Sequence, residues 1–270
     1  MKVQRLIMLV VLFVCVCIGA ISYPFLPAIE AALVPPSTSR HIVKASLTVP
    51  EQFATPPPKQ TMPVPTPANR AASLTPAPTR AAPRILALDT FQRSNQFLWG
   101  TANDGLLWGA DANRKAAFEV IDDSGRIVDG QGTYNAILGP SVTNAEILFT
   151  GQLSSFQQNN VGAVLRWQDD FDWYKAYIDG TQLLLIKDVA GTMTLLNAVF
   201  FTAVANTPYA LRFAIDGTQL FARVWPAGQT EPSTWMIQAT DTSIASGLGG
   251  LRLIVENGAQ AAITMFMETQ

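Results

Sequence analysis

Short apolar runs recur along the chain from about residue 84 to residue 270, and glycine, aspartate and asparagine separate them. Examples are residues 145–153, 161–167, 181–187 and 209–216. The runs are rich in β-branched and aromatic residues, and none carries an amphipathic helical period of useful length. Many short strands with regularly spaced turn residues predict an all-β fold over residues 84–270, a two-sheet antiparallel jelly roll or β-sandwich.

The hexapeptide Ile-Asp-Gly-Thr-Gln-Leu occurs twice, at residues 178–183 and 215–220. Asp-Gly between apolar strands predicts a two-residue type I′ turn, because both central residues of that turn need positive φ. We therefore expect two similar hairpins and no repeat architecture. The pattern leaves open whether the two hairpins lie in the same sheet.

Placing Asp216 and Gly217 at the turn of the second hairpin pairs Ile215 with Thr218. Cross-strand partners share a face of the sheet, so the pairing predicts two distinct faces. The expected core face comprises Leu211, Phe213, Ile215, Leu220, Ala222 and Val224. The expected outer face comprises Arg212, Gln219, Phe221, Arg223 and Trp225.

The same rule assigns the faces of the first hairpin. The expected core face comprises Tyr174, Ala176, Ile178, Leu183 and Leu185, and the outer face Trp173, Lys175, Tyr177 and Gln182. A loop from Asp169 to Asp172 would pair Trp167 with Tyr174, so that Trp167 faces the core and Arg166 joins the outer face. A longer loop would bury Arg166 as an unpaired charge, and we therefore favour the shorter register.

The N-terminus carries a different pattern. Lys2 and Arg5 precede an uncharged apolar run from Leu6 to about Leu26. The run is long enough to cross a bilayer as a helix, and residues 1–28 are expected to be an uncleaved signal anchor or a cleaved signal peptide. In either case the positive residues stay inside, and the C-terminal part is outside the cell. The expected location is the cell membrane, or the medium after cleavage.

Residues 29–83 are rich in proline, threonine and alanine and contain almost no aromatic residues. Such a composition buries too little apolar surface to offset backbone ordering, so we expect a disordered, extended stalk. A proline-rich partner motif is the alternative interpretation.

Composition excludes several chemistries for the predicted β-domain. The net charge of −2 argues against a nucleic-acid partner, which would require a basic surface. The single histidine, His41, lies in the predicted stalk, and both cysteines lie in the N-terminal apolar run. Triad-type nucleophilic catalysis and the usual zinc sites are therefore excluded from residues 84–270, and no cofactor is expected.

Carboxylate chemistry remains open. Glu119, Asp122 and Asp123 come nearest to a glycosidase arrangement, but their spacing does not suit one strand face, and Asp123 begins a predicted turn. Asp169, Asp170 and Asp172 offer oxygen ligands for Ca²⁺, although a solvated turn is the favoured interpretation. We expect no catalytic residues and no resident metal.

The stretches at residues 88–93, 99–108, 164–180, 211–235 and 247–255 together resemble the concanavalin A-like lectin/glucanase superfamily, and within it the laminin-G-like modules of bacterial exported proteins. The resemblance covers residues 88–267. It implies two packed antiparallel sheets, glycan or protein binding on a concave face or loop rim, and in many members a structural Ca²⁺. The last strand here lacks the aspartate that would partner Asp89, which puts such a calcium site in doubt.

These observations favour a membrane-tethered, non-catalytic binding module for a glycan or cell-envelope ligand. The alternatives are a structural or protein-interaction ectodomain, whose partner is a surface protein, and a glycoside hydrolase or polysaccharide lyase. Exposed aromatic residues stack on sugar rings, and cationic residues bind hydroxyl groups. The candidate ligand-binding residues are Arg166, Trp173, Lys175, Tyr177, Arg212 and Arg223.

Overall fold

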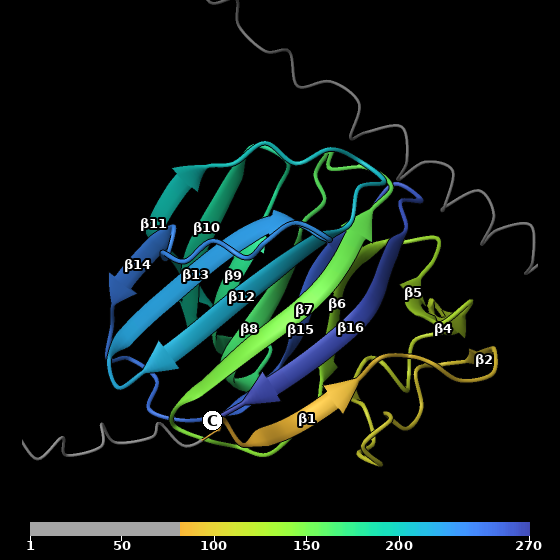
Figure 1. Cartoon of the computed structure of the whole chain (residues 1–270), viewed down its shortest axis with the longest axis horizontal. Helices are drawn as coiled ribbons and strands as arrows, with labels where there is room; N and C mark the ends of the chain where they lie inside the picture. The colour runs from red at the N-terminus through yellow and green to blue at the C-terminus, as the bar shows by residue number, and fades with distance from the viewer. Residues whose placement is uncertain (1–81) are drawn as a thin grey trace, which may run out of the picture. The chain divides into compact units, whose positions relative to one another are not determined.

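The computed structural model describes residues 82–270, which form two antiparallel sheets packed face to face (Figure 1). The all-β prediction is confirmed. The predicted membrane segment and nearly all of the predicted stalk lie outside the described residues. Within residues 82–270, no helix is long and apolar enough to span a membrane.

The larger sheet has nine strands in the order β14-β13-β12-β7-β16-β5-β4-β2, and β1 also pairs with β16. Their bounds are β1 Ile85–Asp89, β2 Gln96–Phe97, β4 Phe118–Ile121, β5 Ser124–Ile127, β7 Ala145–Leu153, β12 Tyr209–Asp216, β13 Gln219–Pro226, β14 Ile237–Thr240 and β16 Ala261–Thr269. β2, β4 and β5 lie together at one end of this sheet (Figure 1).

The smaller sheet has seven strands in the order β11-β10-β9-β8-β15-β6-β3. Their bounds are β3 Gly109–Ala110, β6 Gly132–Ile137, β8 Val161–Asp169, β9 Asp172–Ile178, β10 Gln182–Val189, β11 Thr192–Phe200 and β15 Leu248–Val255. The two repeated hexapeptides therefore lie in different sheets, one in the β9–β10 hairpin and the other in the β12–β13 hairpin.

The main core lies between the sheets, and both hairpins contribute the faces that the sequence predicts. Leu211, Phe213 and Ile215 from β12 are almost fully buried in this core. Tyr174 and Ala176 from β9 enter the same core from the opposite sheet. The period-two alternation therefore determines the inward face of each hairpin correctly.

The predicted turn position is wrong by one residue. Ile215 pairs with Leu220, and Asp216 pairs with Gln219, so that Gly217 and Thr218 form the turn. Gly217 has φ +57°, whereas Asp216 remains in extended strand conformation. A turn with glycine at its first central position needs positive φ only there, which is the type II′ pattern. The shift of partners preserves every face because it moves the register by two residues.

Candidate functional site

The predicted ligand residues of β9 lie on the outer face of the seven-stranded sheet, away from the main core. There Trp173 forms a second apolar cluster with Ile137 and Val164. The predicted exposure of Trp173 is wrong, because only 1% of this residue is accessible to solvent. The Arg252 guanidinium lies 4.7 Å from the Trp173 ring centroid, and the indole Nε1 donates to the Asp170 carbonyl at 3.0 Å.

The predicted contrast between the two tryptophans is also wrong. Trp167 does not enter the main core; it is half-buried and packs against the Trp173 cluster on the outer face. The cause is an irregular register in the β8–β9 hairpin, where Leu165 pairs with Tyr174 and the next pair is Asp169 with Asp172. The extra residues on β8 form a bulge that rotates both Arg166 and Trp167 relative to the prediction.

The predicted position of Arg166 on the outer face is also wrong. Its side chain points to the rim between the two sheets and is only 5% exposed. Its guanidinium donates to the carbonyls of Thr143 at 2.9 Å, Ile244 at 2.6 Å and Gly217 at 2.6 Å. Arg166 is therefore buried without being unpaired, because three loop carbonyls satisfy its guanidinium. Burial lowers the pKa of this guanidinium from its usual value.

Lys175 faces outward from the main core but is buried, with 2% of the residue exposed. Its Nζ donates to Asn160 Oδ1 at 2.5 Å and lies 4.6 Å from the Tyr177 ring centroid. Burial, and then repulsion from Arg252, lower the Lys175 pKa well below its usual range. Tyr177 itself is half-buried. The chain therefore encloses the Lys175 ammonium group instead of presenting it to solvent.

Several other polar groups of this face bind one another, whereas Trp167 Nε1 and Asp188 Oδ1 are buried without a hydrogen-bond partner among residues 82–270. Arg252 Nη1 donates to Asn135 Oδ1 at 2.7 Å, and Asn135 Nδ2 donates to Asp170 Oδ1 at 2.8 Å. Burial raises the pKa of the nearby Asp188 carboxyl. Most donors and acceptors on the outer face of the seven-stranded sheet are thus engaged within the protein.

Arg212 and Arg223 lie on the other sheet, so the six predicted residues do not form one site. Arg212 binds both carboxylate oxygens of Glu231, at 2.5 and 2.9 Å, and also pairs with Glu146. Arg223 Nη2 lies 2.6 Å from a Glu231 oxygen, and its guanidinium stacks 4.4 Å from the Trp235 ring centroid. These contacts hold the segment between β13 and β14 against the outer face of the nine-stranded sheet.

A groove of about 510 Å³ crosses the outer face of the nine-stranded sheet beside this segment. Its lining is mainly hydroxyl, amide and small side chains: Asp122, Ser124, Arg126, Thr150, Gly151, Gln152, Ser154, Asn206, Pro208, Ala227, Gln260, Ala262 and Thr264. Gln152, Asn206 and Gln260 are at least partly exposed, and their side chains make no hydrogen bond to any residue of 82–270. These amides are available to a ligand, unlike the polar groups of the opposite face.

A second hollow of about 240 Å³ lies at the β2–β4 end of the same sheet, lined by Asn95, Gln96, Phe97, Glu119 and Ile121. Phe97 is 87% exposed. Sequence reasoning did not identify either hollow. The turn at Asp122 and Asp123 was the only available signal: both residues have positive φ, at the tip of the β4–β5 hairpin, one residue earlier than predicted.

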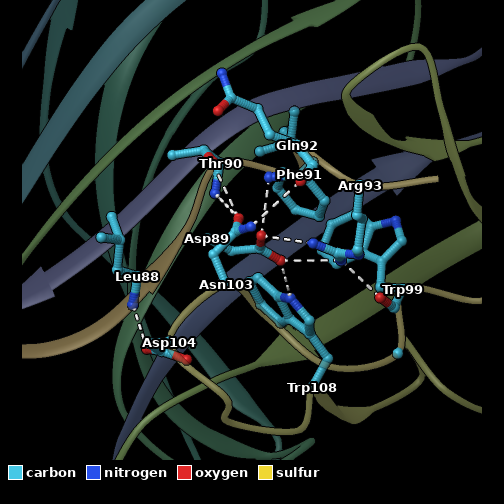
Figure 2. Close-up of polar contacts among 12 residues, drawn as sticks. Leu88, Asp89, Thr90, Phe91, Gln92, Arg93, Trp99, Asn103, Asp104 and Trp108 are labelled. Atoms are coloured by element: carbon cyan, nitrogen blue, oxygen red, sulfur yellow. Dashed lines mark hydrogen bonds and ion pairs between the residues drawn. The ribbon is translucent and has the colours of Figure 1, made fainter.

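The carboxylates considered for calcium have other partners. Asp89 is fully buried, and its oxygens accept hydrogen bonds from Arg93 at 2.7 and 3.1 Å and from Trp108 Nε1 at 2.7 Å (Figure 2). Asp169 Oδ1 accepts from the Phe171 amide at 2.7 Å, as expected of a turn. Among residues 82–270, no group of three His, Cys, Asp or Glu side chains is placed to hold a metal ion.

No protein-family model and no curated protein matches the chain. Among solved structures, it is similar to the xylan β-1,4-xylosidase of Bacillus halodurans C-125, with TM-score 0.52 and 13% identity. That likeness covers 73% of this chain and 41% of the xylosidase, so the chain spans less than half of that enzyme.

Two carbohydrate-binding domains are also among the similar solved structures. The carbohydrate-binding module CBM66 of Bacillus subtilis has TM-score 0.47 and 13% identity, over 69% of this chain and 97% of the module. The carbohydrate recognition domain of Emp46p has TM-score 0.47 and 9% identity, over 68% and 95% of the two chains. At these identities the likeness concerns the fold alone, and membership of the concanavalin A-like superfamily stays a prediction. The laminin-G-like assignment stays a prediction.

Proposed function

We propose that the protein is a non-catalytic glycan-binding module held at the cell surface by its N-terminal segment. One observation carries the proposal: the groove on the nine-stranded sheet presents the side-chain amides of Gln152, Asn206 and Gln260, which make no hydrogen bond within residues 82–270. Ligand sites that bind neutral, hydroxylated molecules need unengaged donors and acceptors, because an engaged group must first lose its internal partner.

The lectin-like sandwich supports the same proposal at the level of fold. A likeness in fold does not transfer a ligand, so the proposal depends on the groove. The sandwich supplies a rigid sheet face on which the groove residues keep their relative positions. Preformed sites of this kind lose little conformational entropy on binding.

Tethering rests on the sequence. Lys2 and Arg5 before the apolar run of residues 6–26 support an inside N-terminus, and residues 29–83 would act as a spacer. The test is protease treatment of intact cells that express the full chain. We expect loss of an epitope at residue 270 with retention of one at residue 1. Protection of both epitopes would contradict surface display.

The non-catalytic part of the proposal rests on the residue types at the groove. Residues 84–270 contain no histidine or cysteine. Asp122, a groove carboxylate, is paired with Arg126 at 3.3 Å. Incubation of the protein with neutral polysaccharides should release no reducing ends and no unsaturated products. Product formation that Glu119→Gln abolishes would instead make it a carbohydrate-active enzyme.

Glycan binding is tested by affinity electrophoresis of the full-length chain through gels that contain xylan, β-glucan, cellulose derivatives, levan or polygalacturonate. A polyoxyethylene detergent keeps the N-terminal segment soluble without adding sugar headgroups. We expect retardation by at least one neutral polysaccharide and none by polygalacturonate. Equal mobility in all gels would contradict glycan binding.

A protein partner is the second candidate function, and edge strand β11 favours it. Met193, Leu195 and Phe200 are 70%, 59% and 89% exposed, and the strand carries no charged residue. Exposed, uncharged edge strands are templates for pairing with another chain. If this is the function, Leu195→Lys should abolish the capture of a surface protein, while the polysaccharide gels show no retardation.

A further inference from the structure

We propose that the nine-stranded sheet carries a linear binding track for an extended, neutral glycan chain, with Phe97 as its stacking residue. The track is the outer row, defined as Phe97, Glu119, Arg126, Ala262 and Gln152. This inference rests on the proposed glycan-binding function and adds the location, the orientation and the class of the ligand.

The strand register places the outer row in a single line across the sheet. Phe97 pairs with Glu119, and Glu119 pairs with Arg126. Arg126 pairs with Ala262, and Ala262 pairs with Gln152. Cross-strand partners share a face, and neighbouring strands lie about 4.8 Å apart. The row therefore crosses five strands and spans about 19 Å, which suits a chain of several sugar rings better than a single ring.

The two hollows of this face follow the row. The smaller hollow contains Phe97 and Glu119, and the larger contains Arg126, Ala262 and Gln152. The β4–β5 hairpin contributes residues to both, so the hollows adjoin along the row. At its far end, Pro208 and Asn206 from the segment before β12 close the larger groove. Asn206 has φ +59°, and its backbone N–H donates to the Leu153 carbonyl at 2.7 Å.

Phe97 supplies an aromatic face at one end of the row. Its 87% exposure leaves the ring in water, at a position where a polar side chain would avoid that cost. The small side chain of Ala262 lies within the row, and Pro208 lines the groove beyond its far end. Apolar CH faces of sugar rings can pack on such surfaces while their hydroxyl groups bind the amides of Gln152 and Asn206.

The charge of the row indicates a neutral ligand. Arg126 is the one cation among the groove and hollow residues described, and Asp122 binds it at 3.3 Å while Glu119 lies opposite on β4. Two carboxylates beside one guanidinium would repel a polyanionic chain.

The test uses oligosaccharides of two to six units derived from whichever neutral polysaccharide retards the wild type, with xylo-oligosaccharides as the first series. Titration calorimetry compares the full-length wild type with Phe97→Ala and Gln152→Ala. Phe200→Ala is the matched control, because Phe200 is an equally exposed phenylalanine on the other sheet, 89% against 87%. All three positions are accessible enough to tolerate truncation.

We expect the hexasaccharide to bind the wild type at least tenfold more tightly than the disaccharide. Phe97→Ala should weaken hexasaccharide binding about tenfold, the usual order for an aromatic anchor, and Phe200→Ala should leave it unchanged. Unchanged hexasaccharide binding by both Phe97→Ala and Gln152→Ala would overturn the track while leaving glycan binding intact. Absence of binding by the wild type to every polysaccharide would overturn glycan binding, and the track with it.

Discussion

The outer faces of the two sheets carry similar kinds of side chain, but these side chains differ in their exposure to solvent and in their hydrogen bonding. On the seven-stranded sheet, Trp173 and Lys175 are buried, and Arg252, Asn135 and Asp170 bind one another. On the nine-stranded sheet, Phe97 is exposed and the Gln152 amide has no partner within residues 82–270. The first face has the residue composition of a ligand site but serves as structure. The second has the unengaged groups that a ligand requires.

The difference shows that an outward position in a strand does not make a side chain available. Period two separates inward from outward positions, but a long side chain from a neighbouring strand can cover an outward position. Arg252 covers Trp173 in this way, from β15. Substitutions on the two faces should therefore separate losses of stability from losses of binding.

Glu268 lies on neither outer face, and its effect on stability serves as a reference for the substitutions on the two faces. It is fully buried between the sheets, neither of its carboxylate oxygens has a hydrogen-bond partner among the described residues, and burial raises its pKa to about 8 from the usual 4.5. Its contribution to stability is complete below pH 4.5 and is lost as the pH rises through about 8. The loss is about 1.4 kcal/mol per pH unit, about 5 kcal/mol in all.

Urea unfolding at several pH values measures this dependence. Glu268→Gln keeps the shape of the side chain without the titration, and it should flatten the curve between pH 5 and pH 8. A wild type equally stable at both pH values would show that Glu268 ionises freely in the folded protein. Ligand binding to either face should not follow this titration.

Arg166→Ala should lower the free energy of unfolding by about 3–5 kcal/mol. The change leaves three loop carbonyls without a donor, one of them buried and two partly buried, and removes the link between loops of the two sheets. Arg166→Lys should recover only part of the loss, since an ammonium group cannot reproduce the planar fork. A loss below 1 kcal/mol in chemical denaturation would mean that water replaces the guanidinium at the rim.

Trp173→Ala and Phe97→Ala compare the two faces directly. Removing the buried Trp173 ring should cost about 3 kcal/mol of stability, through the cavity that it leaves. Removing the exposed Phe97 ring should change stability by no more than about 0.5 kcal/mol. Thermal unfolding monitored by circular dichroism distinguishes the two. Equal destabilisation would contradict the assignment of one face to structure and the other to ligand.

Glu231→Gln should have the smallest effect on stability, about 1 kcal/mol or less, because its ion pairs are partly exposed. Its local effect should be larger, since Arg212 and Arg223 lose their shared partner. Faster amide exchange over residues 227–236, with unchanged exchange in β9, would show that these arginines hold the segment. Unchanged exchange in that segment would assign its position to the Phe221–Trp235 stack, whose ring centroids lie 5.5 Å apart.

The fold and the core were predictable because they depend on local alternation. A register shift of two residues leaves the inward face of a strand unchanged. The incorrect turn position therefore did not affect the predicted burial of Leu211, Phe213 and Ile215. The candidate site was less predictable, because it depends on contacts between distant segments. The acceptors of Arg166 come from three separate loops, and no local pattern announces them.

The outer row illustrates the same limit. Phe97 joins the row through the pairing of β4 with β2 and β5, and Gln152 joins it through the pairing of β16 with β5 and β7. Each strand alone shows one outward residue of no special character. Sequence reasoning therefore chose the richest aromatic stretch, around Trp173, and the structure uses that stretch for packing.

The most direct test of the account is hydroxyl-radical footprinting of the full-length wild type, with and without a saturating neutral hexasaccharide. The method reports the solvent access of individual side chains without any substitution. We expect oxidation of Phe97 to fall severalfold on addition of the hexasaccharide, while oxidation of Phe200 and Tyr177 stays constant. Protection of Tyr177 with unchanged oxidation of Phe97 would place the ligand on the seven-stranded sheet and contradict the central claim.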